Sequence, residues 1–194
     1  EQLVTPLASS QLPLKQGLFE MTAFTSPLEP GEHVLLVKPP VQPNQIPLVR
    51  IHCECMTGDV FGSCRCDCGE QLAQSLELIG KEGGVLIYLR QEGRGLGLAN
   101  KLKAYTLQEQ GYDTVEANLK LGLPVDNRNY AIAYQLLKYV GIDRVRLLTN
   151  NPLKVQALET YGMHVHERLP LLVSPMPENK NYLKTKKEKL GHYL

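Results

Sequence analysis

Three cysteines in one short segment, Cys55, Cys66 and Cys68, have the residue type and the spacing to hold a zinc ion. Ten residues separate Cys55 from Cys66, and one residue separates Cys66 from Cys68. Three protein ligands leave one position of a tetrahedral zinc site open, which distinguishes a catalytic site from a structural one. Zinc with an open position lowers the pKa of bound water to about 7 and so supplies a nucleophile. The segment therefore indicates hydrolysis.

The same segment also allows a purely structural zinc site. If Cys53 joins the other three thiolates, the result is a closed four-cysteine site, and spacing alone does not choose between the two. A disulfide framework fits less well, because the five cysteines are odd in number and crowd into sixteen positions. Cysteine usage favours a reducing compartment, and we expect a cytoplasmic protein.

Composition predicts one globular domain. The chain has 194 residues, of which 43% are hydrophobic, and its net charge of +1 gives no general argument for binding nucleic acid or membranes. No apolar run approaches the roughly 20 residues that span a bilayer, and the N-terminus lacks the pattern of a secretory signal. We expect residues 1–11 to be a flexible lead-in and residues 180–194 a C-terminal helix or tail; a fused domain before residue 1 stays open.

Hydrophobic periodicity predicts strands first and then alternating helices and strands. Strands are expected at 17–24, 33–38, 47–52, 85–89, 145–148 and 164–169. Helices are expected around 72–83, 98–110, 129–140, 152–161 and 182–194. Asn151 and Pro152 suit the cap and first position of one helix. This order predicts an α/β fold, with helices layered on both faces of a mixed sheet.

Three further groups carry side chains suited to a phosphorylated ligand, and each has an ordinary structural explanation. Arg90 and Arg94 flank a glycine-containing loop that follows a strand, but such loops are common. Thr149 and Lys154 surround a helix N-terminus, where anions bind, although helix capping alone explains the asparagine and proline between them.

The third group is Asp126-Asn127-Arg128, and it precedes a helix. A proton-transfer pair and a simple ion pair are both compatible with it, and the ion pair is the more ordinary interpretation. Lys184, Lys186, Lys187 and Lys189 are expected to form a solvated helix face, because no aromatic platform for RNA accompanies them.

Several ordered blocks, from about residue 12 to residue 194, resemble GTP cyclohydrolase II, the enzyme that opens riboflavin synthesis. The blocks are Arg50-Ile-His52-Cys-Glu54-Cys55, Thr57-Gly58-Asp59, Arg65-Cys66-Asp67-Cys68-Gly69, Arg90-Gln-Glu-Gly-Arg94, Gln110-Gly-Tyr-Asp-Thr114-Val-Glu-Ala-Asn118, Leu147-Leu-Thr-Asn-Asn-Pro152 and Lys189-Leu-Gly-His192.

The resemblance implies a zinc-dependent hydrolysis of GTP at two points. C8 of the imidazole ring leaves as formate and pyrophosphate leaves from the triphosphate, giving a diamino-pyrimidinone ribosylamine 5′-phosphate. It further implies one zinc ion per subunit on Cys55, Cys66 and Cys68, magnesium on the triphosphate, and a homodimer. The implied GTP contacts are Arg50, Ile51, His52, Cys53, Glu54, Gln71, Glu92, Gly93, Arg94, Thr114, Thr149 and Lys154.

The resemblance also implies three catalytic residues. Asp126 matches a proton acceptor, Arg128 a nucleophile, and Tyr105 a tyrosine near the ring chemistry. A guanidinium with a pKa above about 12 is a poor nucleophile, so an electrostatic clamp by Arg128 stays open. The sequence departs from the family where Cys53 replaces a common serine, Cys64 a common apolar residue and Asn127 a frequent acidic residue. Two rivals stay open: a nucleotide-sensing module built on a structural zinc site, and a family member that opens the ring without releasing formate.

Overall fold

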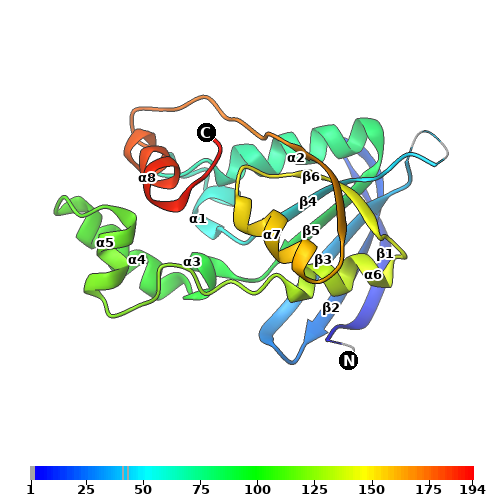
Figure 1. The fold of residues 1–194 in the computed structure, drawn as a ribbon, viewed down its shortest axis with the longest axis horizontal. Helices are drawn as coiled ribbons and strands as arrows, with labels where there is room; N and C mark the ends of the chain where they lie inside the picture. The colour runs from blue at the N-terminus through cyan, green and yellow to red at the C-terminus, as the bar shows by residue number, and fades with distance from the viewer. Residues whose placement is uncertain (1–2, 41, 43) are drawn as a thin grey trace.

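Seven strands form a single mixed sheet in this computed structural model, which describes residues 3–40, 42 and 44–194. The strands are β1 (Thr5–Leu14), β2 (Gly17–Ser26), β3 (Glu29–Lys38), β4 (Leu48–Cys53), β5 (Gly84–Leu89), β6 (Arg144–Leu148) and β7 (His164–Leu169). Their order in the sheet is β1-β2-β3-β5-β4-β6-β7 (Figure 1). The first four in that order pair antiparallel, whereas β5, β4, β6 and β7 pair in parallel. All six expected strands are present.

Helices cover both faces of this sheet, so the expected α/β/α layering is confirmed. The helices α2 (Cys68–Glu82), α6 (Ala131–Tyr139) and α7 (Pro152–Thr160) pack against the sheet. Leu48 and Leu86 join Ile79 of α2 in one core cluster. Ile51 and the other apolar residues of β4 and β5 that point to the opposite face join Leu136 of α6 in the second cluster. This split follows from the strand geometry, because successive side chains of a strand point to opposite faces.

The remaining helices gather at the end of the sheet where β4, β5 and β6 finish (Figure 1). They are α1 (Met56–Asp59), α3 (Glu92–Gly95), α4 (Leu98–Glu109), α5 (Thr114–Lys120) and α8 (Lys180–Leu190). The chain leaves β4 toward β5 through α2, on one face, and leaves β5 toward β6 through α6, on the other. Ligands of open α/β sheets bind where such crossovers diverge, outside the carboxyl ends of the strands.

Two expectations about the ends of the chain need correction. Residues 5–11 are no lead-in, because they belong to the edge strand β1, which pairs with β2 along its length. The last helix spans 180–190 rather than 182–194, and it ends at Gly191, whose φ of 65° is left-handed. Among the described residues, no helix combines the length and apolar character that crossing a membrane requires.

Candidate active site and metal centre

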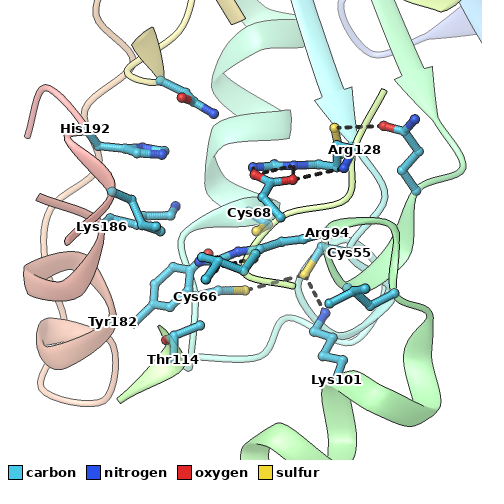
Figure 2. A pocket seen from close by; sticks show the side chains of 18 of the residues that line it. Cys55, Cys66, Cys68, Arg94, Lys101, Thr114, Arg128, Tyr182, Lys186 and His192 are labelled. Carbon is cyan, nitrogen blue, oxygen red and sulfur yellow. Dashed lines mark hydrogen bonds and ion pairs between the residues drawn. The ribbon is translucent and has the colours of Figure 1, made fainter. Parts of the chain in front are cut away.

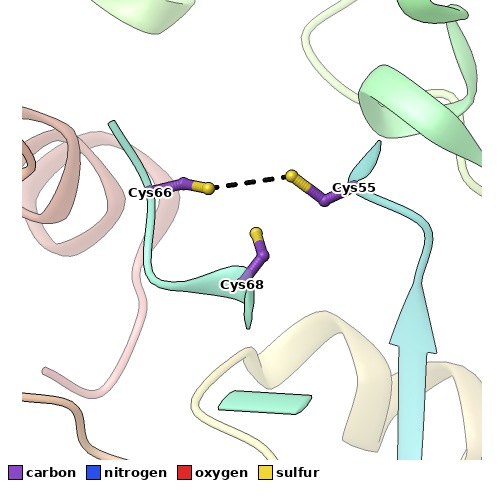
Figure 3. Close-up of side chains that lie close together, drawn as sticks. All are labelled: Cys55, Cys66 and Cys68. Carbon is purple, nitrogen blue, oxygen red and sulfur yellow. Dashed lines mark hydrogen bonds between the residues drawn. The ribbon is translucent and has the colours of Figure 1, made fainter. Parts of the chain in front are cut away.

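Three sulfur atoms converge just beyond the carboxyl end of β4. The Sγ atoms of Cys55, Cys66 and Cys68 all lie within 4.8 Å of one another, and those of Cys55 and Cys66 are 3.7 Å apart (Figure 3). Zinc–sulfur bonds of 2.3 Å in tetrahedral geometry place sulfurs about 3.8 Å apart. The donor set and its spacing therefore fit a zinc ion held by three thiolates.

Cys53 does not belong to this group. Its thiol lies on the last residue of β4, and its Sγ is 3.8 Å from Oε1 of Gln91. Within the described part of the chain, the cluster able to hold a metal contains the other three cysteines and lacks Cys53. The geometry therefore favours the open three-ligand site over the closed four-cysteine site.

A buried carboxylate fixes the first of the three cysteines. Asp59 accepts a hydrogen bond from the backbone N–H of Cys55 at 3.0 Å and from the hydroxyl of Tyr88 at 2.8 Å. Nε2 of His52 lies 3.0 Å from the same carboxylate. Burial lowers the pKa of His52, although Asp59 opposes the shift. These contacts tie the metal loop to strands β4 and β5.

Positive charge lies against the same sulfur. Nζ of Lys101 is 3.0 Å from Sγ of Cys55 and 2.9 Å from a carboxylate oxygen of Glu92. Hydrogen bonding among the sulfurs and the lysine lowers the pKa of Cys55, while the contact with Cys55 raises that of Cys66 to about 11. The surrounding groups of the protein therefore favour one thiolate, that of Cys55. A cation between the three sulfur atoms would favour the ionised form of all three.

A glycine leaves room for the cluster. A Cβ atom on Gly58 would lie 2.8 Å from Sγ of Cys66 and 3.3 Å from Sγ of Cys55. We expect Gly58→Ala to displace these sulfurs and to lower zinc affinity by at least about tenfold, as loss of a ligand's supporting groups does. Titration with a competing chelator measures this. Gly80→Ala, at a crowded glycine that faces Gln16 instead of the sulfurs, tests whether the loss is local. An unchanged affinity in Gly58→Ala would contradict the packing argument.

The cysteine cluster opens into a pocket of about 530 Å³ (Figure 2). This volume lies within the range of small-molecule sites. Seven lysine and arginine side chains line the pocket against three carboxylates, so its charge suits an anionic ligand. Every residue expected to bind metal or GTP, or to act in catalysis, lines the pocket except Ile51. Ile51 is fully buried, and its carbonyl oxygen accepts from Nζ of Lys154 at 2.7 Å.

Two buried cations lie at the base of the pocket. Arg50 donates to Oε1 of Gln71 at 2.7 Å and to the carbonyl oxygen of Leu148 at 3.1 Å. Its Nε is buried and has no hydrogen-bond partner among the described residues. Lys154, in the first turn of α7, is 5% exposed, and burial lowers its pKa to about 7. An anion at this position would accept a hydrogen bond from Nε of Arg50 and would favour the charged form of Lys154.

Asp126 and Arg128 form an ion pair at one wall of the pocket. Nε of Arg128 lies 2.9 and 3.1 Å from the two carboxylate oxygens of Asp126. Burial opposes the charge on Arg128, but Tyr130, Cys53 and Asp126 outweigh it and hold its pKa well above the usual value. The pKa of Asp126 is lowered, because its contacts with Arg128 outweigh its burial. The expected ion pair is confirmed.

The glycine-containing loop after β5 separates its two arginines. Arg90 pairs with Glu54 at 2.9 Å and lies outside the pocket lining, which agrees with the ordinary structural explanation of this loop. Arg94 lines the pocket from a left-handed turn with a φ of 61°, a conformation that costs free energy outside glycine. Its carbonyl oxygen accepts from N–H of Asn127 at 3.0 Å, which ties the two loops together.

Comparison with known sequences identifies the family of this chain. The profile of the family described as GTP cyclohydrolase II matches residues 5–170. The chain belongs to this family. It is 54% identical over 195 aligned residues to the riboflavin biosynthesis protein RibBA of Bacillus cereus (strain ATCC 10987 / NRS 248), and 53% identical to that of Bacillus cytotoxicus. Each alignment covers 100% of this chain and 49% of the relative, so the chain spans about half the length of these relatives.

A solved structure shares the fold of this GTP cyclohydrolase II family member. The two-domain 3,4-dihydroxy-2-butanone 4-phosphate synthase RibBX of A. baumannii aligns with a TM-score of 0.50 at 20% identity. The alignment covers 90% of this chain and 41% of that structure. At this level of identity the likeness extends to the fold alone.

Sequence reasoning missed several pocket residues of the GTP cyclohydrolase II chain. Lys101 carried no signal, because one lysine on a helix is typical of a solvated face. The C-terminal helix was expected to be solvated, yet Tyr182 and Lys186 line the pocket together with His192 of the tail (Figure 2). Lys189 lines it as well. The expectation of a solvated face is therefore wrong for Lys186, which is buried, and it holds for the exposed Lys184 and Lys187.

Proposed function

We propose that this chain hydrolyses GTP at C8 of the guanine and in its triphosphate, releasing formate and pyrophosphate in riboflavin synthesis. One observation carries the proposal: three cysteines able to hold a metal open onto the same pocket as seven cationic side chains, in a member of this family. The cationic side chains suit the triphosphate of a purine nucleotide, which is its strongly anionic end. The cysteine cluster suits the other end, the base.

Zinc is the metal that we propose for the three cysteines, because thiolates at this spacing suit it. When bound with one position open, zinc supplies an activated water for attack on a carbon centre. The residues around the cluster have defined tasks. Asp59 orients Cys55, and the ammonium of Lys101 offsets negative charge that three thiolates bring to the site.

The triphosphate is proposed to bind in the same pocket, with magnesium and with Arg50, Arg94 and Lys154. Nε of Arg50 and Nζ of Lys154 are buried donors, and the former has no protein partner among the described residues. Cations held in place before reaction stabilise the charge that spreads over phosphate oxygens as pyrophosphate leaves. Glu54, Gln71, Glu92 and Thr149 shape this pocket through hydrogen bonds to their neighbours.

Arg128 is proposed to act as a fixed cation for the phosphates, positioned by Asp126. Its raised pKa works against nucleophilic attack, which would require the guanidinium to lose a proton to a carboxylate of lowered pKa. Tyr105, on α4, lines the same pocket, and burial raises its pKa. A protonated hydroxyl at neutral pH suits a donor to groups that gain charge as the ring opens.

A direct assay tests the proposal. Zinc-loaded protein is incubated with GTP and magnesium, and formate and pyrophosphate are measured in the same samples, with ATP as the control. We expect both products from GTP and neither in comparable amount from ATP, because unpaired polar groups facing the wrong base each cost about 1–3 kcal/mol. Ring opening without formate would identify the truncated reaction, and binding of GTP without turnover would identify a sensing module.

The lowered pKa of Lys154 predicts proton uptake on nucleotide binding. Free protein at pH 8 holds Lys154 largely neutral, because its pKa is about 7, and a bound triphosphate raises that pKa. Affinity should therefore fall as pH rises above 7, and binding should take up a proton. Calorimetry in two buffers of different ionisation enthalpy measures the uptake. Equal proton uptake by Lys154→Met would exclude Lys154 as its source.

A further inference from the structure

A buried ion pair joins the C-terminal helix to the metal loop. Nζ of Lys186, on α8, lies 2.7 Å from Oδ1 of Asp67, and the two side chains are 11% and 2% exposed. Asp67 stands between the ligands Cys66 and Cys68 in the sequence. The pair thus connects the loop that carries two of the three sulfur atoms to a helix 119 residues away along the chain.

Asp67 uses its carboxylate for contacts with side chains and caps no backbone N–H of its own helix. It occupies the N-cap position of α2, where an aspartate ordinarily accepts from backbone N–H groups of the first turn, yet its side chain makes no capping hydrogen bond. One oxygen accepts from Lys186, and the other accepts from Nε2 of Gln71 at 2.6 Å. One oxygen is therefore committed to α8 and the other to a side chain of α2 itself.

The contacts continue to the base of the pocket. Oε1 of Gln71 accepts from Arg50 at 2.7 Å, and Arg50 also donates to the carbonyl oxygen of Leu148 at the end of β6. An unbroken series of buried hydrogen bonds therefore runs from α8 through Asp67 and Gln71 to Arg50. Networks of this kind hold their satisfied members in one arrangement, and here Nε of Arg50, at the pocket end, is left without a partner among the described residues.

The helix that Lys186 anchors forms a wall of the pocket. Tyr182 and Lys186 of α8 line the pocket, and so does His192 of the following tail (Figure 2). The tail is held by the N–H of Tyr193, which donates to the carbonyl oxygen of Asn150 at 2.9 Å. Removing one partner of a buried ion pair leaves an uncompensated charge, so the wall and the metal loop should loosen together.

We propose that Lys186 is a positioning residue that clamps the C-terminal helix to the loop between Cys66 and Cys68. The clamp holds the pocket wall and two metal ligands as one unit. This inference rests on the proposed metal centre, because its consequence for function is retention of zinc. It makes no demand on which reaction the pocket performs.

The clamp predicts that a substitution on α8 affects the metal loop and that a substitution in the metal loop affects α8. Lys186→Met should speed the release of zinc to a chelator by about 10-fold or more, as loss of a ligand's supporting groups does. Asp67→Asn should expose the lysines of α8 to trypsin, although the substitution lies far away in the sequence. Lys187→Met is the matched control, because the exposed Lys187 lies one position along the same helix. Lys186→Arg keeps a donor and should retain most of the wild-type behaviour.

The double variant Asp67→Asn with Lys186→Met completes the test, with circular dichroism confirming that each variant is folded. We expect zinc release from it to be no faster than from the worse single variant, because both substitutions break one interaction. Additive effects would overturn the clamp, and so would zinc release from Lys186→Met equal to that of Lys187→Met. The trypsin measurement needs neither metal nor GTP. Wild-type protein that binds no zinc would instead overturn the metal centre itself.

Discussion

Cys66→Ser should lose both its zinc and its formate release, whereas Cys53→Ser should keep its zinc. Cys66 lies 3.7 Å from Cys55 within the three-sulfur cluster, while the Cys53 thiol contacts Gln91. A serine hydroxyl at position 66 cannot replace a thiolate ligand at neutral pH. We expect formate release to fall by more than the roughly 100-fold that loss of a merely supporting group produces.

Metal analysis after dialysis, with formate measured on the same preparations, checks this pair of variants. Cys64→Ser is a second control, because Cys64 is exposed and lies outside the cluster. Loss of zinc from Cys53→Ser would support a closed four-cysteine site and the structural module. Full activity in Cys66→Ser would show that the reaction does not require the metal.

Arg128→Met should lower kcat by about a thousandfold, the lower end of what a cation stabilising a transferring phosphoryl group is worth. The reason is its place beside the proposed triphosphate site, held by both oxygens of Asp126. Arg128→Lys keeps the charge and should recover part of that loss, although a lysine cannot reproduce the bidentate contact.

The two variants also separate the proposed role of Arg128 as a fixed cation from the nucleophile role that the family resemblance implied. A fixed cation tolerates lysine with reduced kcat, and rapid-quench experiments should find no phosphorylated or guanylylated protein. Complete loss of turnover in Arg128→Lys, together with a trapped covalent adduct in the wild type, would restore Arg128 as a nucleophile.

The strands and helices that bury apolar side chains could be predicted from the sequence. The segment of β5 is a short apolar run, and that of β4 is rich in β-branched and apolar residues. Asn151 and Pro152 indicate the start of α7, and the structure uses them as N-cap and first position. The edge strand β1 could not be predicted in the same way. It is almost wholly exposed and contains Pro6 and Pro13, which suit only an edge.

The site was predictable where chemistry is local and unpredictable where it depends on distant contacts. Three cysteines within fourteen residues are a local signal, and the structure brings them together. The partners of Lys101 and Lys186 are 46 and 119 residues away, and a lysine-rich helix looks the same in sequence whether its lysines face solvent or a buried aspartate. The pairing of Arg90 with Glu54, 36 residues away, is another distant contact that carries no local signal.

The open coordination position is tested most directly by zinc K-edge X-ray absorption on the zinc-loaded protein without nucleotide. We expect three sulfur neighbours at about 2.3 Å and one lighter oxygen neighbour at about 2.0 Å, the distances usual for zinc. Four sulfur neighbours, with Cys53 as the fourth, would contradict a catalytic metal centre in this chain.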